Sequence, residues 1–150
     1  MWHKFTTWVI KDPHFHCGIA LWMTTRSGVP RLFICEAGIK RRVILLSSYL
    51  GSDMDVLKAP VDIGKYEEHM LSRVGVTPYS LWDYLSVALR IWLDVPVRCP
   101  FGNKGEICSE MVQKEYATAG YPTAHIVLSP GELYRLLLRD GCELRVRVEA

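Results

Sequence analysis

The chain has 150 residues, of which 49% are hydrophobic and 23% charged, and its formal net charge is +2. This length fits a single domain, residues 1–150, that can bury a core, and the composition excludes a disordered chain. The basic residues are scattered, and short clusters such as Lys40-Arg41-Arg42 are typical of solvated strand ends. The charge pattern therefore predicts no nucleic-acid partner.

The cysteines predict neither a metal site nor a secreted disulfide framework. They stand at positions 17, 35, 99, 108 and 142, are odd in number and never form a Cys-x-x-Cys motif. No histidine pair has zinc-ligand spacing, so we expect no metal and no other cofactor. The first residues lack the apolar run of a signal peptide, and no apolar stretch approaches the ~20 residues that span a bilayer. We expect free thiols in the cytoplasm, in a cytosolic or phage-encoded protein or in one released without a signal.

The first third of the chain predicts β-strands. Strands are expected over residues 5–11, 15–24, 31–37 and 42–47, and a further one over 54–58. Within 15–24, His16, Gly18 and Ala20 share one face because successive side chains alternate along a strand. The small residues on this face are expected to let a helix approach the sheet closely.

The turn between the second and third of these strands predicts which side chains meet. A three-residue loop over 25–27, with Gly28 nearby to adopt a positive φ, places His16 directly opposite Glu36. Directly opposed side chains have Cβ atoms ~5 Å apart, so a carboxylate there can hold an imidazole. A slip of one residue would put Glu36 on the other face of the sheet.

The rest of the chain predicts helices. They are expected over 62–74, 81–93 and 108–119, where Gly120 ends the last of them, and from the Ser129-Pro130-Gly131-Glu132 capping box to residue 139. Residues 95–105 read as a loop, 125–128 as strand or extended loop, and 142–149 as a terminal strand. Strands followed by helices indicate an α+β fold with a mostly antiparallel sheet and helices on one side.

Cys108 is the candidate nucleophile because it opens a predicted helix. The unpaired N–H groups and partial positive charge of a helix start lower a thiol pKa, and a neighbouring imidazole completes the activation. Cysteines on alternating strands are more often small core residues, which is our interpretation of Cys17, Cys35 and Cys142. Cys99 is interpreted as a loop thiol, and its disulfide with Cys108 is the disfavoured alternative.

Several motifs resemble one enzyme family. Phe15-His16-Cys17-Gly18-Ile19-Ala20-Leu21 resembles the histidine-bearing strand of NlpC-type papain-like enzymes, and residues 33–37 and 55–58 resemble later strands. Ile107-Cys108-Ser109-Glu110-Met111-Val112 and Ser129-Pro130-Gly131-Glu132-Leu133 resemble two helices of its circularly permuted YiiX/YebB-like branch, in which the cysteine follows the histidine. The resemblance spans roughly residues 8–140. Cys17 and Cys35 stand where the family has aliphatic residues, and the glycine-aspartate expected ahead of the first strand is missing.

The resemblance implies a papain-like fold and a triad. Cys108 is the implied nucleophile, His16 the general base and acid, and Glu36 the residue that orients the imidazole. N–H donors at the helix start, of Cys108 or Ser109, would stabilise the oxyanion. Tyr79, with Trp82 and Tyr84, would line a substrate groove, although aromatic residues at helical spacing are more often core. His14, two residues before His16, remains the alternative base.

The function expected is that of a cysteine amidase or peptidase working through an acyl-enzyme. The resemblance implies cell-wall (peptidoglycan) stem peptides as substrate. An acyl-ester or thioester hydrolase or acyltransferase acting on lipid is the alternative, because the permuted branch also includes enzymes thought to cleave lipid-linked acyl groups. A catalytically inactive binding module of the same fold is the third reading, and the presence of Cys108, His16 and Glu36 argues against it.

Overall fold

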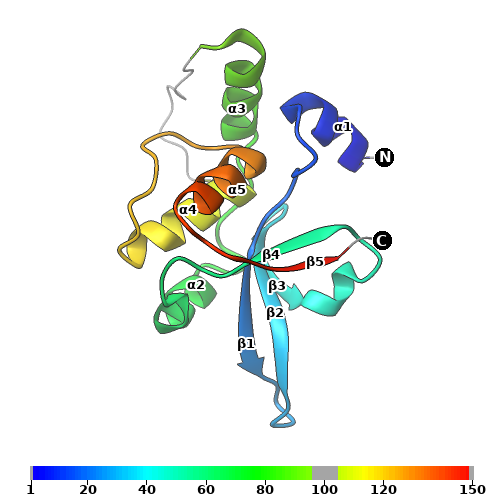
Figure 1. Ribbon diagram of the computed structural model, residues 1–150. Helices are drawn as coiled ribbons and strands as arrows, with labels where there is room; N and C mark the ends of the chain where they lie inside the picture. Colours follow the sequence, from blue (N-terminus) through cyan, green and yellow to red (C-terminus); the bar gives the residue numbers. More distant parts are fainter. Residues whose placement is uncertain (1, 96–104, 149–150) are drawn as a thin grey trace.

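The computed structural model describes residues 2–95 and 105–148 and shows two antiparallel sheets with helices around them (Figure 1). One sheet has the strand order β1-β2-β3, and the other pairs β4 with β5. The elements in chain order are α1 (Trp2–Ile10), β1 (Ile19–Thr24), β2 (Pro30–Ala37), β3 (Arg41–Leu45), η1 (Leu46–Tyr49), β4 (Met54–Leu57), η2 (Ile63–Tyr66), α2 (Glu67–Ser72), α3 (Leu81–Leu93), α4 (Cys108–Thr118), α5 (Pro130–Arg139) and β5 (Leu144–Val148).

The predicted α+β class with antiparallel strands is confirmed. The helix expected over 81–93 has those bounds, and its start is capped by the Ser80 hydroxyl, which accepts from the Asp83 N–H. The capping box at Ser129 is present as predicted and opens α5. The helix expected over 62–74 is instead a 3₁₀ turn, η2, followed by the short α2.

The predicted strand over residues 5–11 is wrong, because this segment belongs to helix α1. Val9 and Ile10 are buried, and the Trp92 indole N–H of α3 donates to the Val9 carbonyl at 2.7 Å. The Trp8 and Trp92 rings also meet, with centroids 5.3 Å apart. Packing against α3 therefore overrides the β propensity of these residues, and Figure 1 shows the two helices side by side.

The predicted register of the first hairpin is also wrong, by two residues. Ile19 pairs with Cys35, whereas direct opposition of His16 and Glu36 would have paired it with Phe33. The loop is longer than predicted: residues 25–29 form it, the Thr25 N–H donates to the Val29 carbonyl, and Gly28 has φ +77°. Since side chains alternate with period two, a slip of two keeps Glu36 on the predicted face.

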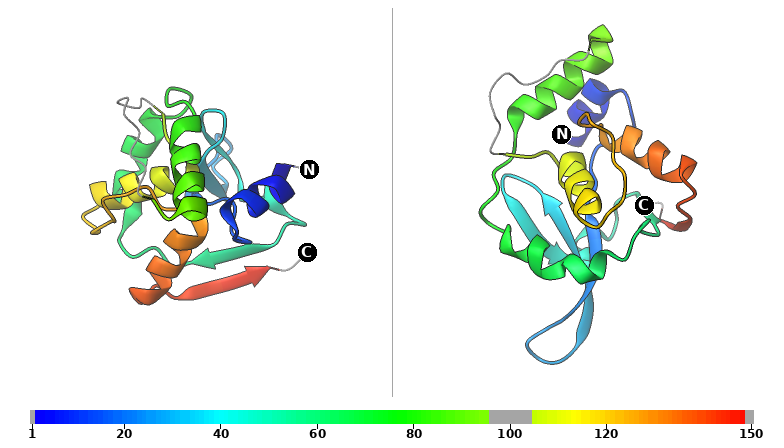
Figure 2. Two further views of the ribbon diagram at one scale, coloured as in Figure 1. Left: turned by 90° about the horizontal axis from the view of Figure 1, so that it is seen from above. Right: turned by 90° about the vertical axis from the view of Figure 1, so that its left-hand side faces the viewer.

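The hydrophobic core lies between the three-stranded sheet and α4. Ile19, Leu21 and Cys35 point into it from β1 and β2, and Met111 and Val112 enter it from α4. This is the face opposite to that of Ala20 and Trp22, which are exposed. The expectation that α4 approaches the face of Ala20 is therefore wrong, whereas His16 and Gly18 precede β1 and do not belong to either face of the strand. The far end of the β1–β2 hairpin projects away from the helices (Figure 2).

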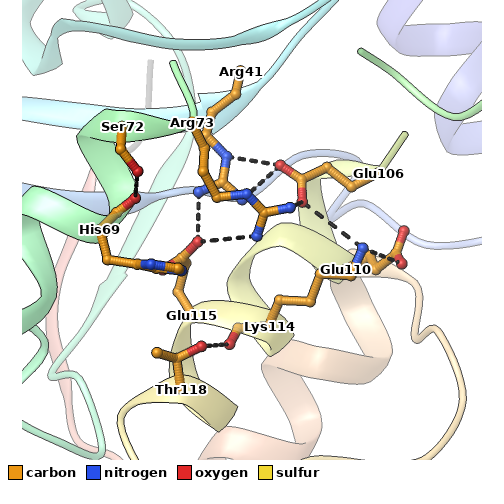
Figure 3. Close-up of polar contacts among 9 residues, drawn as sticks. All are labelled: Arg41, His69, Ser72, Arg73, Glu106, Glu110, Lys114, Glu115 and Thr118. Carbon is orange, nitrogen blue, oxygen red and sulfur yellow. Dashed lines mark hydrogen bonds and ion pairs between the residues drawn. The ribbon is translucent and has the colours of Figure 1, made fainter. Parts of the chain in front are cut away.

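A buried ionic cluster joins β3 to both ends of the segment that carries Cys108 (Figure 3). Arg41 is 1% exposed, and its Nε donates to Glu106 Oε1 at 2.7 Å while its Nη1 donates to Glu115. Glu106 precedes α4 and Glu115 lies within it, and both are fully buried. Arg73 and Lys114 stand farther away, with N–O distances of 3.8 to 4.0 Å. One buried guanidinium thus ties two points of this segment to β3, which fixes the position and orientation of α4 relative to the sheet.

Replacing Arg41 tests how much this cluster contributes to the stability of the fold. Arg41→Ala leaves two buried carboxylates without their cation, so we expect the free energy of unfolding to fall by ~3–5 kcal/mol. Arg73→Ala is the matched control: its side chain is 33% exposed and its ion pairs are long, so its effect should stay within ~1 kcal/mol. Urea denaturation of both variants gives the comparison. Equal losses would show that Arg41 has no special role.

Candidate active site

Cys108 is the first residue of α4 and is almost fully buried, with 4% of its surface exposed. Two backbone hydrogen bonds fix the segment just before Cys108: the Glu106 N–H donates to Pro78 O, and the Ser80 N–H donates to Glu106 O. Gly105 is required for this pairing, because a Cβ there would lie 2.9 Å from the Pro78 carbonyl. The first N–H groups of a helix have no intrahelical acceptor, so Cys108 stands where a negative charge is stabilised.

His16 reaches Cys108 from the segment just before β1. Its imidazole is hydrogen-bonded to the Cys108 sulfur, and its Nε2 lies 2.7 Å from Glu36 Oε2. Because Nε2 faces the carboxylate, Nδ1 is the nitrogen left for the sulfur. Gly18 makes this path possible, since a Cβ at that position would lie 2.7 Å from the Cys35 carbonyl of β2. The predicted trio of Cys108, His16 and Glu36 is therefore in contact, although the strand predicted over 15–24 begins only at Ile19 and His16 has no strand partner.

Glu36 is fully buried and every side of its carboxylate has a donor. Oε2 accepts from His16 and from the Tyr49 hydroxyl. Oε1 accepts from Arg42, whose Nε and Nη2 lie at 2.7 and 2.6 Å. Burial alone would raise the pKa of this carboxyl, but the hydrogen bonds from His16 and Tyr49 outweigh it and hold the pKa at about 2. Glu36 is therefore a permanent anion beside the imidazole.

The surroundings of Cys108 and His16 favour a thiolate–imidazolium pair. The strongest effect on Cys108 is a hydrogen bond from the Cys17 thiol, which together with the contact to His16 lowers its pKa well below the ordinary value despite burial. Burial opposes the charged form of His16, but hydrogen bonds to Cys108 and Glu36 raise its pKa to about 10. Both shifts favour the negatively charged sulfur and the positively charged ring, which is the state required for nucleophilic attack.

Tyr79 and Ser109 differ in what they offer to a substrate. The Ser109 hydroxyl donates to the Leu128 carbonyl at 2.5 Å, so only its backbone N–H remains for an oxyanion. Tyr79 lies in the segment that pairs with Glu106. Burial, followed by the nearby negative charge of Cys108, raises its pKa, so the phenol stays a hydrogen-bond donor. Trp82, by contrast, is 59% exposed on α3.

The alternative base, His14, lies in a different cluster. Its Nδ1 is 2.9 Å from Asp12 Oδ1, and its ring stacks on Tyr134 of α5 with centroids 4.2 Å apart. Asp55 lies on its other side, at 3.6 Å. These contacts join the segment after α1 to α5 and β4, and they leave His16 as the imidazole beside Cys108.

Three residues of the site were missed by sequence reasoning. Tyr49 and Arg42 hold Glu36, and Cys17 is hydrogen-bonded to Cys108 rather than being a simple core residue. Pairing the predicted strands β2 and β3 could have found Arg42, because this residue lies directly opposite Glu36. Nothing in the sequence pattern points to Tyr49, because it lies in the 3₁₀ turn η1. Cys99 lies outside the described residues.

Comparison with known proteins does not assign the chain to a family. No protein-family model, curated protein or solved structure matches the chain. Across residues 2–95 and 105–148, no group of three or more His, Cys, Asp or Glu side chains is arranged to hold a metal ion. Among these same residues, none of the helices is both long and apolar enough to cross a bilayer. The function is argued below from the site.

Alkylation tests the ion pair. We expect iodoacetamide to modify Cys108 at pH 6 nearly as fast as at pH 8, because its pKa is lowered below the ordinary thiol value. In His16→Ala the same reaction should need a higher pH, since a cation that stabilises the thiolate is gone. Peptide mass mapping at each pH gives the profile. His14→Ala is the control and should match the native chain; identical profiles in all three proteins would exclude the pair.

Glu36→Gln should lower the stability of the protein. The amide cannot accept from all the donors around Glu36, so we expect a loss of ~1–3 kcal/mol in unfolding free energy. The carboxylate pKa is depressed in the folded state, so its stabilisation is present above the unfolded value and is lost as pH falls toward 2. Denaturation between pH 7 and 2 should show that loss in the native chain and much less of it in Glu36→Gln. Glu68→Gln, on the exposed side of α2, serves as control and should follow the native curve.

Proposed function

We propose that the protein is a cysteine hydrolase that works through an acyl-enzyme, with Cys108, His16 and Glu36 as its triad. One observation carries the proposal: the sulfur at the start of α4 is hydrogen-bonded to an imidazole whose other nitrogen lies 2.7 Å from a buried carboxylate. A structural cysteine needs no such chain of partners. The order of roles is the one that nucleophile activation requires: a nucleophile, a base that faces it, and a third group that orients the base.

In the first half of the reaction the Cys108 thiolate attacks the carbonyl carbon of the substrate. The carbonyl oxygen becomes an oxyanion, which we expect the N–H groups of Cys108 and Ser109 and the Tyr79 hydroxyl to stabilise. The His16 imidazolium then gives its Nδ1 proton to the leaving group. The bond to the leaving group breaks, and a thioester on Cys108 remains.

In the second half, neutral His16 takes a proton from water as the water attacks the thioester carbon. Collapse of the new tetrahedral intermediate releases the carboxylic acid and restores the thiolate. Glu36 stays ionised throughout, because its pKa is about 2, and it holds the ring in one orientation while stabilising the imidazolium. Arg42 and Tyr49 keep the carboxylate in place for this role.

The substrate we propose is an amide of a cell-wall-type peptide. This choice rests on the resemblance of the histidine and cysteine motifs to NlpC-type enzymes. A high pKa for His16 suits amide cleavage, since a leaving amine must be protonated as the bond breaks.

A second candidate, hydrolysis or transfer of a lipid acyl ester or thioester, is favoured by the surface of α3. This helix begins two residues after Tyr79 and exposes a set of large apolar side chains. The exposed residues are Leu81, Trp82, Leu85, Leu89, Trp92 and Leu93. A face of this kind beside the site suits an acyl chain better than a polar peptide.

An adduct experiment tests both candidates. The protein is incubated with soluble stem peptides or with a long-chain acyl thioester, quenched in acid, and Cys108 is examined by mass spectrometry. We expect an acyl adduct on Cys108 with one substrate class, and none in Cys108→Ser. The adduct should fall by at least ~10²-fold in His16→Ala, because base assistance is lost. Cys142→Ser is the control and should behave as the native chain.

The outcomes separate the hypotheses. An adduct from the peptide alone supports the amidase, and one from the thioester alone supports the acyl-lipid enzyme. If Cys108 is alkylated rapidly yet forms no adduct with either substrate, both substrate classes are wrong. If Cys108 is no more reactive than Cys142, the hydrolase proposal itself is wrong and a binding module remains.

A further inference from the structure

We propose that Cys17 is a resolving thiol, which forms a reversible disulfide with Cys108 after a hydroperoxide has oxidised the nucleophile. The site thus takes a second class of reactant besides an acyl substrate. The inference rests on the proposed function only in sharing the Cys108 thiolate, and its evidence is a separate pair of contacts.

Two contacts join Cys17 to Cys108. The Cys17 thiol and the Cys17 backbone N–H are both hydrogen-bonded to the Cys108 sulfur. Cys17 also packs against the core cluster that contains Cys108, and it directly follows His16, which bonds the same sulfur. Residues far apart in sequence thus bring two sulfur atoms together beside one imidazole. The acyl-transfer mechanism uses Cys108 and His16 but leaves the Cys17 thiol without a chemical role.

The other described cysteines lie elsewhere. Cys35 is on β2 opposite Ile19, and burial raises its pKa to about 11. Cys142 follows α5, where its backbone N–H donates to Leu137 O. Both are free thiols, as are Cys17 and Cys108. Cys35 is therefore a matched reference: a buried thiol in the same core whose charged neighbours are Arg41 and the carboxylates around it.

The two thiols of the pair differ in charge, which fixes the order of events. Cys108 is the thiolate, whereas the pKa of Cys17 is raised by its hydrogen bond to Cys108 and by burial. A peroxide therefore reacts at Cys108 first, because the thiolate is the nucleophile. Once Cys108 is a neutral sulfenic acid, the negative charge that kept Cys17 protonated is gone, and Cys17 ionises more readily.

The steps balance. The Cys108 thiolate attacks one peroxide oxygen, the O–O bond breaks, and the departing hydroxide takes a proton from His16 to become water. Cys108 is now a sulfenic acid, oxidised by two electrons. The Cys17 sulfur attacks the Cys108 sulfur, the S–O bond breaks, and the Cys17 proton leaves with the hydroxide as a second water. An external dithiol returns two electrons and restores both thiols.

The consequence is a nucleophile that is switched off under oxidation rather than destroyed. While the disulfide exists, Cys108 cannot attack a carbonyl carbon. Without a resolving thiol, the sulfenic acid would proceed to sulfinic and sulfonic acids, which a dithiol cannot reverse.

The test compares the native chain, Cys17→Ser and Cys35→Ser. Each is treated with hydrogen peroxide without any substrate, free thiols are blocked, and peptides are mapped without reduction. A second portion is treated with dithiothreitol before alkylation of Cys108 is measured. In the native chain and in Cys35→Ser we expect a peptide pair linked through Cys17 and Cys108, and recovery of alkylation by dithiothreitol. In Cys17→Ser we expect Cys108 as sulfinic or sulfonic acid and loss of that recovery.

The native map alone decides the matter if Cys17→Ser does not fold. Cys108 in its sulfinic form with Cys17 still a free thiol would overturn the proposal, as would a disulfide between Cys108 and Cys99. Equal recovery in Cys17→Ser and the native chain would overturn it as well. Because no substrate is present, failure here leaves the acyl-adduct result untouched, and failure to form an acyl adduct leaves this map interpretable.

Discussion

Two consecutive arginines on β3 determine where the site forms. Side chains of a strand alternate between its faces, so Arg41 points into the core and Arg42 points to the opposite face. Arg41 binds Glu106 and Glu115 and so fixes α4, which carries the sulfur. Arg42 binds Glu36, the carboxylate that holds the imidazole. One strand thus positions both Cys108 and Glu36, the carboxylate beside His16, from opposite faces of the same sheet.

The buried ions also explain why the site can be compact. Arg41 takes two carboxylates and Glu36 takes donors from three side chains, so few charges are left without a partner in the interior. Against this background the Cys108–His16 pair can be ionic although the sulfur is nearly inaccessible. Its stabilisation comes from fixed partners rather than from water, which is the form of electrostatic support that does not need to reorganise during a reaction.

The two sulfur atoms give the site a second property. The residue that contributes most to the low pKa of Cys108 is Cys17. Its thiol can form a disulfide, whereas a serine or an aliphatic side chain at this position could not. In the proposed enzyme, activation of the nucleophile and its sensitivity to oxidation therefore have one structural origin. A group that stabilises a thiolate by hydrogen bonding stands, by the same contact, where it can form a disulfide.

The sequence by itself determined the elements with strong local signals, and it singled out the three residues of the proposed triad. The alternation of β2 and β3, the apolar stripe of α3 and the capping box at Ser129 are local features, and so is a cysteine at a helix start. The predicted contact between His16 and Glu36 is present, although His16 lies before β1 and the register of β1 and β2 differs from the predicted one by two residues. Tertiary structure alone decided the rest: α1 is helical because it packs on α3, and Tyr49 and Cys17 reach the site through long-range folding. Local pattern fixes which face a side chain takes, whereas contacts between distant segments depend on how the whole core packs.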